Sequence, residues 1–335
     1  MREFAYLRAA SVAEAVAMMA AMMAATPPDG GPARYLAGGT NLVDLMREEV
    51  ERPGRVVDIS RLPLSAVEDL PGGGLRLGAL AGNTKVAADP RVRRRYPVLA
   101  RAILAGASPQ LRNRATVGGN LLQRTRCRYF YDTAAACNKR VPGAGCDALE
   151  GFNRAHAVLG ASPSCVAVHP SDMCVALAAL DATVNLTGPQ GTRSVPFTGF
   201  HVLPGRTPQV ETVLRDGELV TSVDLPPAPP GRGAYAKVRD RAGFAFALVS
   251  TAVLLHVEDG RIVFARVALG GVAHKPWRAH AAEDLLTGAV PDASAFARAA
   301  GVALAEARPL RHNAFKPVLA ARLLRRTLTE LARPS

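Results

Sequence analysis

The chain has 335 residues, about twice the length of an ordinary domain, so we expect at least two packed units. Apolar residues make up 49% and charged residues 21% of the sequence, proportions that are typical of a folded globular protein. No apolar run reaches the roughly 18 residues that a membrane-spanning helix requires, so we expect no insertion into a membrane.

The net charge is +13, and 36 of the 41 basic residues are arginines. A basic surface can bind nucleic acid, but these arginines are spread singly along the chain, and the one tight basic run, 91–95, is short. Aromatic residues make up only 5%, which disfavours a stacking surface for single-stranded nucleic acid. We therefore expect no nucleic-acid partner, and we keep a zinc-binding nucleic-acid-binding protein as an alternative.

The N-terminus predicts a short strand followed by a helix. Two arginines precede the apolar stretch 15–25, an arrangement that superficially resembles a secretion signal. Against a signal, residues 4–7 have the pattern of a strand, and Ser11 and Glu14 have the spacing of a capping box at the start of a helix. A small β-α-β-α-β unit over residues 1–60 then includes a Pro/Gly loop (26–32), a strand (34–37), a short helix (41–49) and a strand (55–59).

The rest of the chain alternates strands and helices around one clear boundary. Before it we expect strands at 75–80, 183–186 and 219–225 and a helix at 96–106. The run Pro226–Gly231 contains four prolines and marks the boundary. After it we expect strands at 234–238, 249–257 and 261–269, the last two joined by a Glu-Asp-Gly hairpin turn, and helices at 276–286, 293–307 and 314–331. The fold class is therefore α+β, with domains 1–226 (subdomains of about 1–60 and 61–226) and 232–335.

Two Gly-Gly loops are candidates for a nucleotide site. The first, Leu36–Asn41, lies between a strand and a helix, where glycines let a ligand approach the backbone and free N–H groups attract phosphate. We expect the second, Thr116–Asn120, to be flanked by strands as well. Neither loop has the dinucleotide or P-loop fingerprint, so by chemistry alone a plain turn is the commoner interpretation.

All five cysteines lie within 48 residues, at positions 127, 137, 146, 165 and 174. No C-x2-C pair is present, so zinc-finger, ribbon and bacterial-ferredoxin patterns fail. The turn-rich segment 121–171 is longer than an ordinary loop and needs an anchor. Four thiolates around a [4Fe–4S] cluster, three cysteines with His156 or His169 around zinc, and free thiols all stay open. Cys174 lies in an apolar, helix-like run, and we expect a buried core thiol there.

Six short motifs follow one another along the chain: Phe4-x-Tyr6-x-Arg8, Ala37-Gly-Gly-Thr40, Leu77-Gly-Ala79 with Asn83-Thr84, Thr116-Val-Gly-Gly-Asn120, His169-Pro-Ser-Asp172 and Tyr235-Ala-Lys237. In this order they resemble the FAD-binding subunit of the xanthine dehydrogenase / CO dehydrogenase family of molybdenum hydroxylases, over essentially the whole chain. The resemblance implies a PCMH-type FAD-binding domain of two α+β subdomains, followed by a CO dehydrogenase flavoprotein C-terminal domain.

The resemblance also implies a set of cofactor contacts. The pyrophosphate and adenosine end of FAD would be held by the first loop and its flank, namely Leu36, Ala37, Gly38, Gly39, Thr40, Asn41, Leu42 and Val43. The residues that lie along the flavin side of the cofactor would be Thr116, Val117, Gly118, Gly119 and Asn120. Asp172 and Lys237 would be further contacts.

Ordinary members of the family run almost directly from the second glycine loop into the Ser-Asp segment, whereas 51 residues separate Asn120 from Asp172 here. This insertion resembles that of the FAD subunit of bacterial periplasmic-type aldehyde oxidoreductases, which holds a [4Fe–4S] cluster. The implied cluster ligands are Cys127, Cys137, Cys146 and Cys165, and Cys174 is left out.

By this resemblance the chain would be the electron-transfer subunit of a heterotrimeric aldehyde oxidoreductase. Electrons would pass from a molybdopterin-binding large subunit through a [2Fe–2S] small subunit to this FAD and on to an external acceptor, with no catalytic base in this chain. A stand-alone flavin oxidase is the second alternative. The location would be cytoplasmic, or periplasmic if a signal-bearing partner subunit carries the folded complex out.

Overall fold

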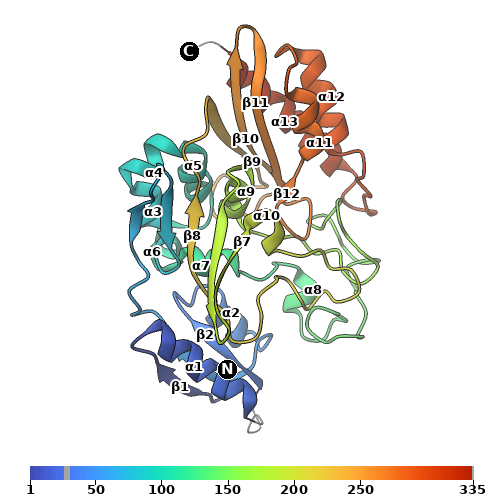
Figure 1. Ribbon diagram of the computed structural model, residues 1–335. Coiled ribbons are helices and arrows are strands. Elements are labelled where there is room, and N and C mark those ends of the chain that lie inside the picture. The colour runs from blue at the N-terminus through green and yellow to red at the C-terminus, as the bar shows by residue number, and fades with distance from the viewer. Residues whose placement is uncertain (26–30, 334–335) are drawn as a thin grey trace.

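The computed structural model describes residues 1–25 and 31–333, and Figure 1 shows three sheets that follow one another along the chain. Most of the Pro/Gly loop expected at 26–32 lies outside the described residues. The fold consists of helices and three separate sheets, in agreement with the predicted α+β class. Within the described ranges, no helix is both long and apolar enough to cross a membrane.

The N-terminal unit is a parallel three-stranded sheet of order β1-β3-β2. A capping box sets the start of its first helix. The Ser11 hydroxyl accepts from the Glu14 N–H at 3.1 Å, and the Glu14 carboxylate accepts from the Ala10 N–H at 2.7 Å. The predicted strand–helix start is therefore confirmed. The elements are β1 (Ala5–Arg8), α1 (Val12–Ala24), β2 (Gly31–Leu36), α2 (Leu42–Arg47) and β3 (Pro53–Asp58).

The middle of the chain forms an antiparallel five-stranded sheet of order β4-β5-β8-β6-β7, with short helices beside it. The strands are β4 (Val67–Asp69), β5 (Leu75–Gly78), β6 (Thr183–Gly188), β7 (Gly191–Pro196) and β8 (Leu219–Leu225). The helices are α3 (Asn83–Ala88), α4 (Pro90–Arg95), α5 (Pro97–Ala105), α6 (Pro109–Arg114), α7 (Val117–Leu121), α8 (Arg128–Tyr131), α9 (Asp172–Ala179) and α10 (Phe197–Phe200).

The C-terminal sheet is antiparallel, with the order β12-β11-β10-β9, and three helices pack on one of its faces (Figure 1). Its elements are β9 (Arg232–Val238), β10 (Val249–Glu258), β11 (Arg261–Gly270), β12 (Trp277–Arg278), α11 (His280–Leu286), α12 (Ala293–Ala303) and α13 (Phe315–Ala332). Asp259 and Gly260 both have positive φ, as a tight hairpin turn requires. The helix expected from 276 begins only at His280, because Trp277 and Arg278 pair with Leu269 and Ala268 of β11.

Helix α9 is the centre of the core. All eight of its residues are buried, and it contacts α5 on one side and the strands β10 and β11 on the other. Ala252, Leu254 and Ala268 of the C-terminal sheet therefore belong to the same hydrophobic cluster as β5, α5 and β8. The two larger sheets share one core across the proline-rich boundary.

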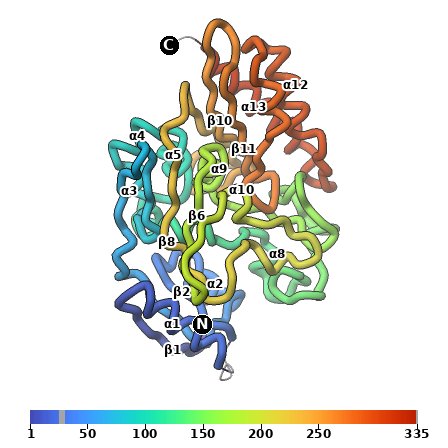
Figure 2. The backbone as a smooth tube through the Cα atoms, in the orientation of Figure 1, coloured from blue at the N-terminus to red at the C-terminus, as the bar shows by residue number. Residues whose placement is uncertain are grey.

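The cysteine-bearing insertion has little regular structure and is held by buried polar groups. In Figure 2 its green tube lies beside the C-terminal helices. Lys316 of α13 is fully buried and donates to the carbonyl oxygens of Ala155, His156 and Gly271 at 3.0, 2.8 and 2.7 Å. Two buried backbone oxygens of the insertion, those of Ala155 and His156, thus find their donor on α13.

A second buried lysine, Lys139, ties the insertion to the rest of the chain. Its ammonium group donates to Glu211 at 2.7 Å, to the Pro208 carbonyl at 2.8 Å and to Nε2 of His274 at 2.8 Å. Burial, with Lys139 as the next cause, lowers the pKa of His274 to about 3. The ring is therefore neutral in the folded protein and accepts the lysine N–H.

We predict that His274→Gln weakens the acid sensitivity of the fold. An unfolded chain protonates His274 below about pH 6.5, whereas the folded chain resists protonation down to about 3, so stability present above pH 6.5 is lost as the pH falls. One such group contributes about 2 kcal/mol of loss between pH 6.5 and 5. The thermal midpoint of the variant should drop less between pH 7.5 and 5.0 than that of the wild type. Equal drops would contradict the assignment.

Candidate functional site

Two adjoining cavities, of about 260 and 640 Å³, meet at the glycine loops, and Thr40, Asn41 and Gly119 line both. The first cavity extends along 34–42 and reaches the first residues of β8. The second extends between α5, α6 and the loop 241–246. Together they form one elongated site, which suits a long ligand better than a compact one.

The first glycine loop passes close to another backbone segment. A Cβ atom on Gly38 would overlap the carbonyl oxygen of Arg114, and Gly39 has a φ of +77°, which side chains rarely adopt. The Val43 N–H then donates to the Gly39 carbonyl at 3.1 Å as α2 begins. The predicted residues 36–42 all line the first cavity, whereas Val43 lines neither cavity.

The second glycine segment is a helix start rather than a loop between strands, so that expectation was wrong. Helix α6 precedes it, and the Thr116 hydroxyl caps α7 by accepting from the Gly119 N–H at 3.2 Å. The Gly118 N–H donates to the Ala79 carbonyl at 2.7 Å, an approach that the missing side chain permits. Thr116, Gly118 and Gly119 line the first cavity and Asn120 the second, while Val117 is fully buried in the core.

Asp172 and Lys237 form a buried ion pair at the wall of the second cavity. Their charged atoms lie 2.7 Å apart, and Lys237 also donates to the Ala105 carbonyl at 3.0 Å. The Tyr235 hydroxyl donates to the other oxygen of Asp172, and burial beside that carboxylate raises the pKa of Tyr235 well above its usual value. The ammonium group of Lys237 keeps one further N–H for a ligand.

Several buried polar atoms beside the second cavity have no partner among the described residues. They are Asn41 Nδ2, Asn83 Oδ1, Arg112 Nε and Arg126 Nε. Buried polar groups are normally hydrogen-bonded, so these atoms fit a polar or anionic ligand. The sequence offered no way to distinguish Arg112 from the other arginines. Arg126 was noticeable only as a neighbour of Cys127.

Four cysteines converge on one small cavity within the insertion: Cys127, Cys137, Cys146 and Cys165. Cys137 and Cys146 face each other in an antiparallel bridge, and His156 Nε2 lies 3.1 Å from the sulfur of Cys127. Burial is the main cause that raises the pKa of Cys127 to about 12 and of Cys165 to about 11. All four are free thiols in the structure.

Thiolates bind both zinc and iron–sulfur clusters, so the four cysteines that line one cavity are a candidate metal site.

Comparison with known proteins gives the family. Residues 2–228 match the family described as the FAD binding domain in molybdopterin dehydrogenase, and residues 233–331 match the CO dehydrogenase flavoprotein C-terminal domain. The chain belongs to the FAD-binding subunits of the molybdenum hydroxylases. It is thus the flavin subunit of an oxidoreductase, and the adjoining cavities at its two glycine segments are the candidate FAD site.

Two relatives of this FAD-binding subunit match over nearly their full lengths. The aldehyde oxidoreductase FAD-binding subunit PaoB of Escherichia coli is 52% identical over 98% of both chains. The carbon monoxide dehydrogenase medium chain of Hydrogenophaga pseudoflava is 28% identical over 97% of this chain and 96% of that one. A solved structure of that dehydrogenase superposes with a TM-score of 0.76 at 27% identity, over 98% of this chain and 97% of the other.

We predict that Gly38→Ala lowers both FAD content and stability. The added Cβ would push the loop off the Arg114 carbonyl, at a cost of roughly 1–3 kcal/mol. Gly301→Ala is the matched control, because its Cβ would enter open space on α12 and alanine favours a helix. Released flavin and the thermal midpoint measure both effects. Full flavin content in Gly38→Ala would contradict the role given to this loop.

Proposed function

We propose that this chain is the FAD- and [4Fe–4S]-binding electron-transfer subunit of a molybdenum-dependent aldehyde oxidoreductase. The observation that carries the proposal is the 52% identity, over 98% of both chains, to a protein named as an aldehyde oxidoreductase FAD-binding subunit. The convergence of four cysteines on one cavity supports the cluster.

The FAD would lie along the two adjoining cavities. The backbone of residues 36–42 would hold the pyrophosphate and adenosine end, and Thr116–Asn120 would run beside the flavin. FAD supplies the redox chemistry when bound, while the protein positions it and sets the local charge. The unpartnered guanidinium nitrogens of Arg112 and Arg126 and the remaining N–H of Lys237 would favour an anionic ligand in the second cavity.

The [4Fe–4S] cluster would be held by Cys127, Cys137, Cys146 and Cys165. Bound there, it would exchange one electron at a time. The two sites are adjacent in the chain and in space, because Cys127 follows Arg126, and Arg126 lines the flavin cavity. This adjacency supports an exchange of electrons between cluster and flavin.

The partners would be a molybdopterin-binding large subunit and a [2Fe–2S] small subunit. Support comes from the names of relatives, several of which are medium chains or medium subunits. The similarity to these relatives also supports a division of the chain into two domains, 1–226 and 232–335. For location we propose the cytoplasm, or the periplasm if a signal-bearing partner carries the folded complex.

The test is a visible spectrum of the anaerobically purified full chain, with iron, sulfide, zinc and released flavin quantified. We expect the bands of oxidised flavin above a broad iron–sulfur shoulder, with about four irons per chain. Flavin without iron would reject the cluster and keep the flavin subunit. A colourless chain would contradict the flavin site as well.

We further predict that Cys127→Ser or Cys146→Ser removes the iron and loosens residues 121–171, because a thiolate ligand is lost. The matched control is Cys174→Ser, which should keep full iron, since Cys174 does not line the four-cysteine cavity. Iron analysis and limited proteolysis measure the two effects. Equal iron in all three variants would refute the ligand assignment.

A further inference from the structure

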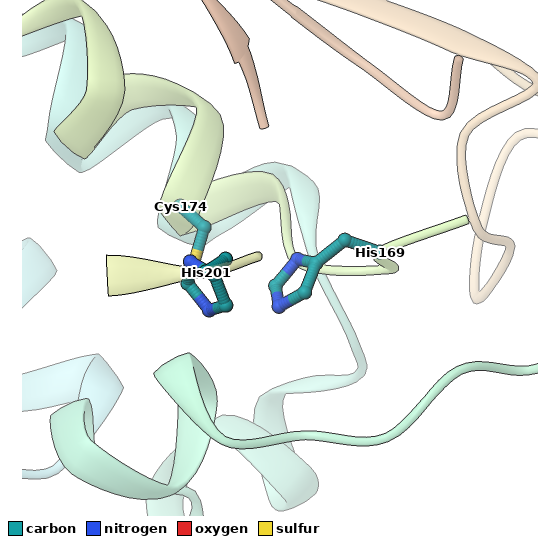
Figure 3. A group of neighbouring side chains, drawn as sticks. All are labelled: His169, Cys174 and His201. Carbon is teal, nitrogen blue, oxygen red and sulfur yellow. The ribbon is translucent and has the colours of Figure 1, made fainter. Parts of the chain in front are cut away.

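A second cluster of metal-binding side chains lies outside the four-cysteine cavity. It consists of His169, Cys174 and His201, and one ligand atom from each lies within 4.8 Å of the other two (Figure 3). Cys174 comes from α9, His169 from the segment before that helix, and His201 directly follows α10. The predicted core thiol is fully buried, as expected, but it has two imidazole neighbours that the sequence did not indicate.

The two rings are oriented by one backbone oxygen. His201 Nε2 lies 2.9 Å from the Leu121 carbonyl oxygen, and His169 Nε2 lies 3.4 Å from the same atom. Metal-binding histidines commonly donate one ring N–H to such a carbonyl, so that the other nitrogen can bind the metal. In His169 this other nitrogen, Nδ1, accepts from the Ser171 N–H at 3.3 Å, and an ion bound there would displace that contact. The other nitrogen of His201, Nδ1, is buried without any partner in the described structure.

An ion has a route to this cluster. His169 and His201 line a cavity of about 270 Å³ that also borders Leu121, Glu211 and His274. His169 is partly exposed, whereas Cys174 and His201 are buried, with 0% and 4% of their surface accessible to solvent. Two of the three donors, His169 and His201, therefore border a polar cavity, whereas Cys174 is buried and does not line it.

We propose that His169, Cys174 and His201 bind one Zn²⁺ ion, with the fourth position facing the cavity. One thiolate and two imidazoles suit this borderline-soft ion. Ligand atoms around tetrahedral zinc lie about 3.3–3.8 Å apart, and the present separations are within 4.8 Å, so the side chains must close by up to about 1.5 Å.

The ion would have a structural role next to the flavin cavity. Leu121 ends α7, which carries the second glycine segment, and Cys174 lies on α9 two residues after Asp172. A zinc ion bound here would hold α9 to the segment that follows α10, and the Leu121 carbonyl would fix both rings from the end of α7. The site uses none of the four cysteines assigned to iron, so it is independent of the proposed cluster.

The experiment is equilibrium dialysis of the purified full chain, freed of loosely bound metal by a chelator, against Zn²⁺ alone. The wild type should hold one zinc per chain, and Cys174→Ser and His201→Gln should each lose at least nine-tenths of it. His280→Gln, at a side chain that is 68% exposed, is the matched control and should keep the zinc. Zinc-edge X-ray absorption should give one sulfur at about 2.3 Å and two nitrogens at about 2.0–2.1 Å.

Iron and flavin content separate this proposal from the preceding one, since both should be unchanged in Cys174→Ser and His201→Gln. Zinc that stays bound in these two variants, a wild type without zinc, or a spectrum with several sulfur ligands would each overturn the site. The last result would place zinc among the four cysteines instead. If Cys174→Ser does not fold, His201→Gln and the spectrum of the wild type decide the question.

Discussion

The buried pair of Asp172 and Lys237 is the contact on which the arrangement of the site depends. Asp172 begins the central helix α9, and Lys237 lies on β9 of the C-terminal sheet. Both are nearly inaccessible, so removing either one would leave an uncompensated charge in the interior, which typically costs 3–5 kcal/mol. Because the pair also lines the second cavity, the shape of that cavity depends on how the C-terminal sheet docks on α9.

The insertion that carries the cysteines depends on the same docking. Its backbone is held by Lys316 of α13 and by Asn313 in the turn before that helix, and Lys139 from the insertion reaches His274 beyond β11. These buried donors replace the hydrogen bonds that a strand or helix would make internally. The four thiols therefore take their positions from groups that lie more than a hundred residues away. The flavin site and the cysteine site form one structural unit.

The arginine-rich composition has a largely internal explanation. Arg124 pairs with both Glu51 and Glu211, and Arg278 pairs with Glu283 and Asp181. Further arginine pairs connect separate strands and loops, among them Arg76–Asp224 and Arg193–Glu218. The planar guanidinium group suits such bidentate contacts. Many arginines thus join parts of this chain to each other. The positive net charge is therefore weaker evidence for a basic surface that binds a partner.

The sequence by itself determined the features that are local. The capping box at Ser11, the hairpin turn at Asp259–Gly260 and most strands depend on neighbouring residues, and the ordered motifs indicated the family. The tertiary structure alone decided what arises between distant segments. It joined the second glycine segment to Ala79, paired Trp277 with β11, joined Asp172 to Lys237 and brought His201 to Cys174. Such contacts are determined by packing across the fold, because sequence spacing carries no information about which buried side chains meet.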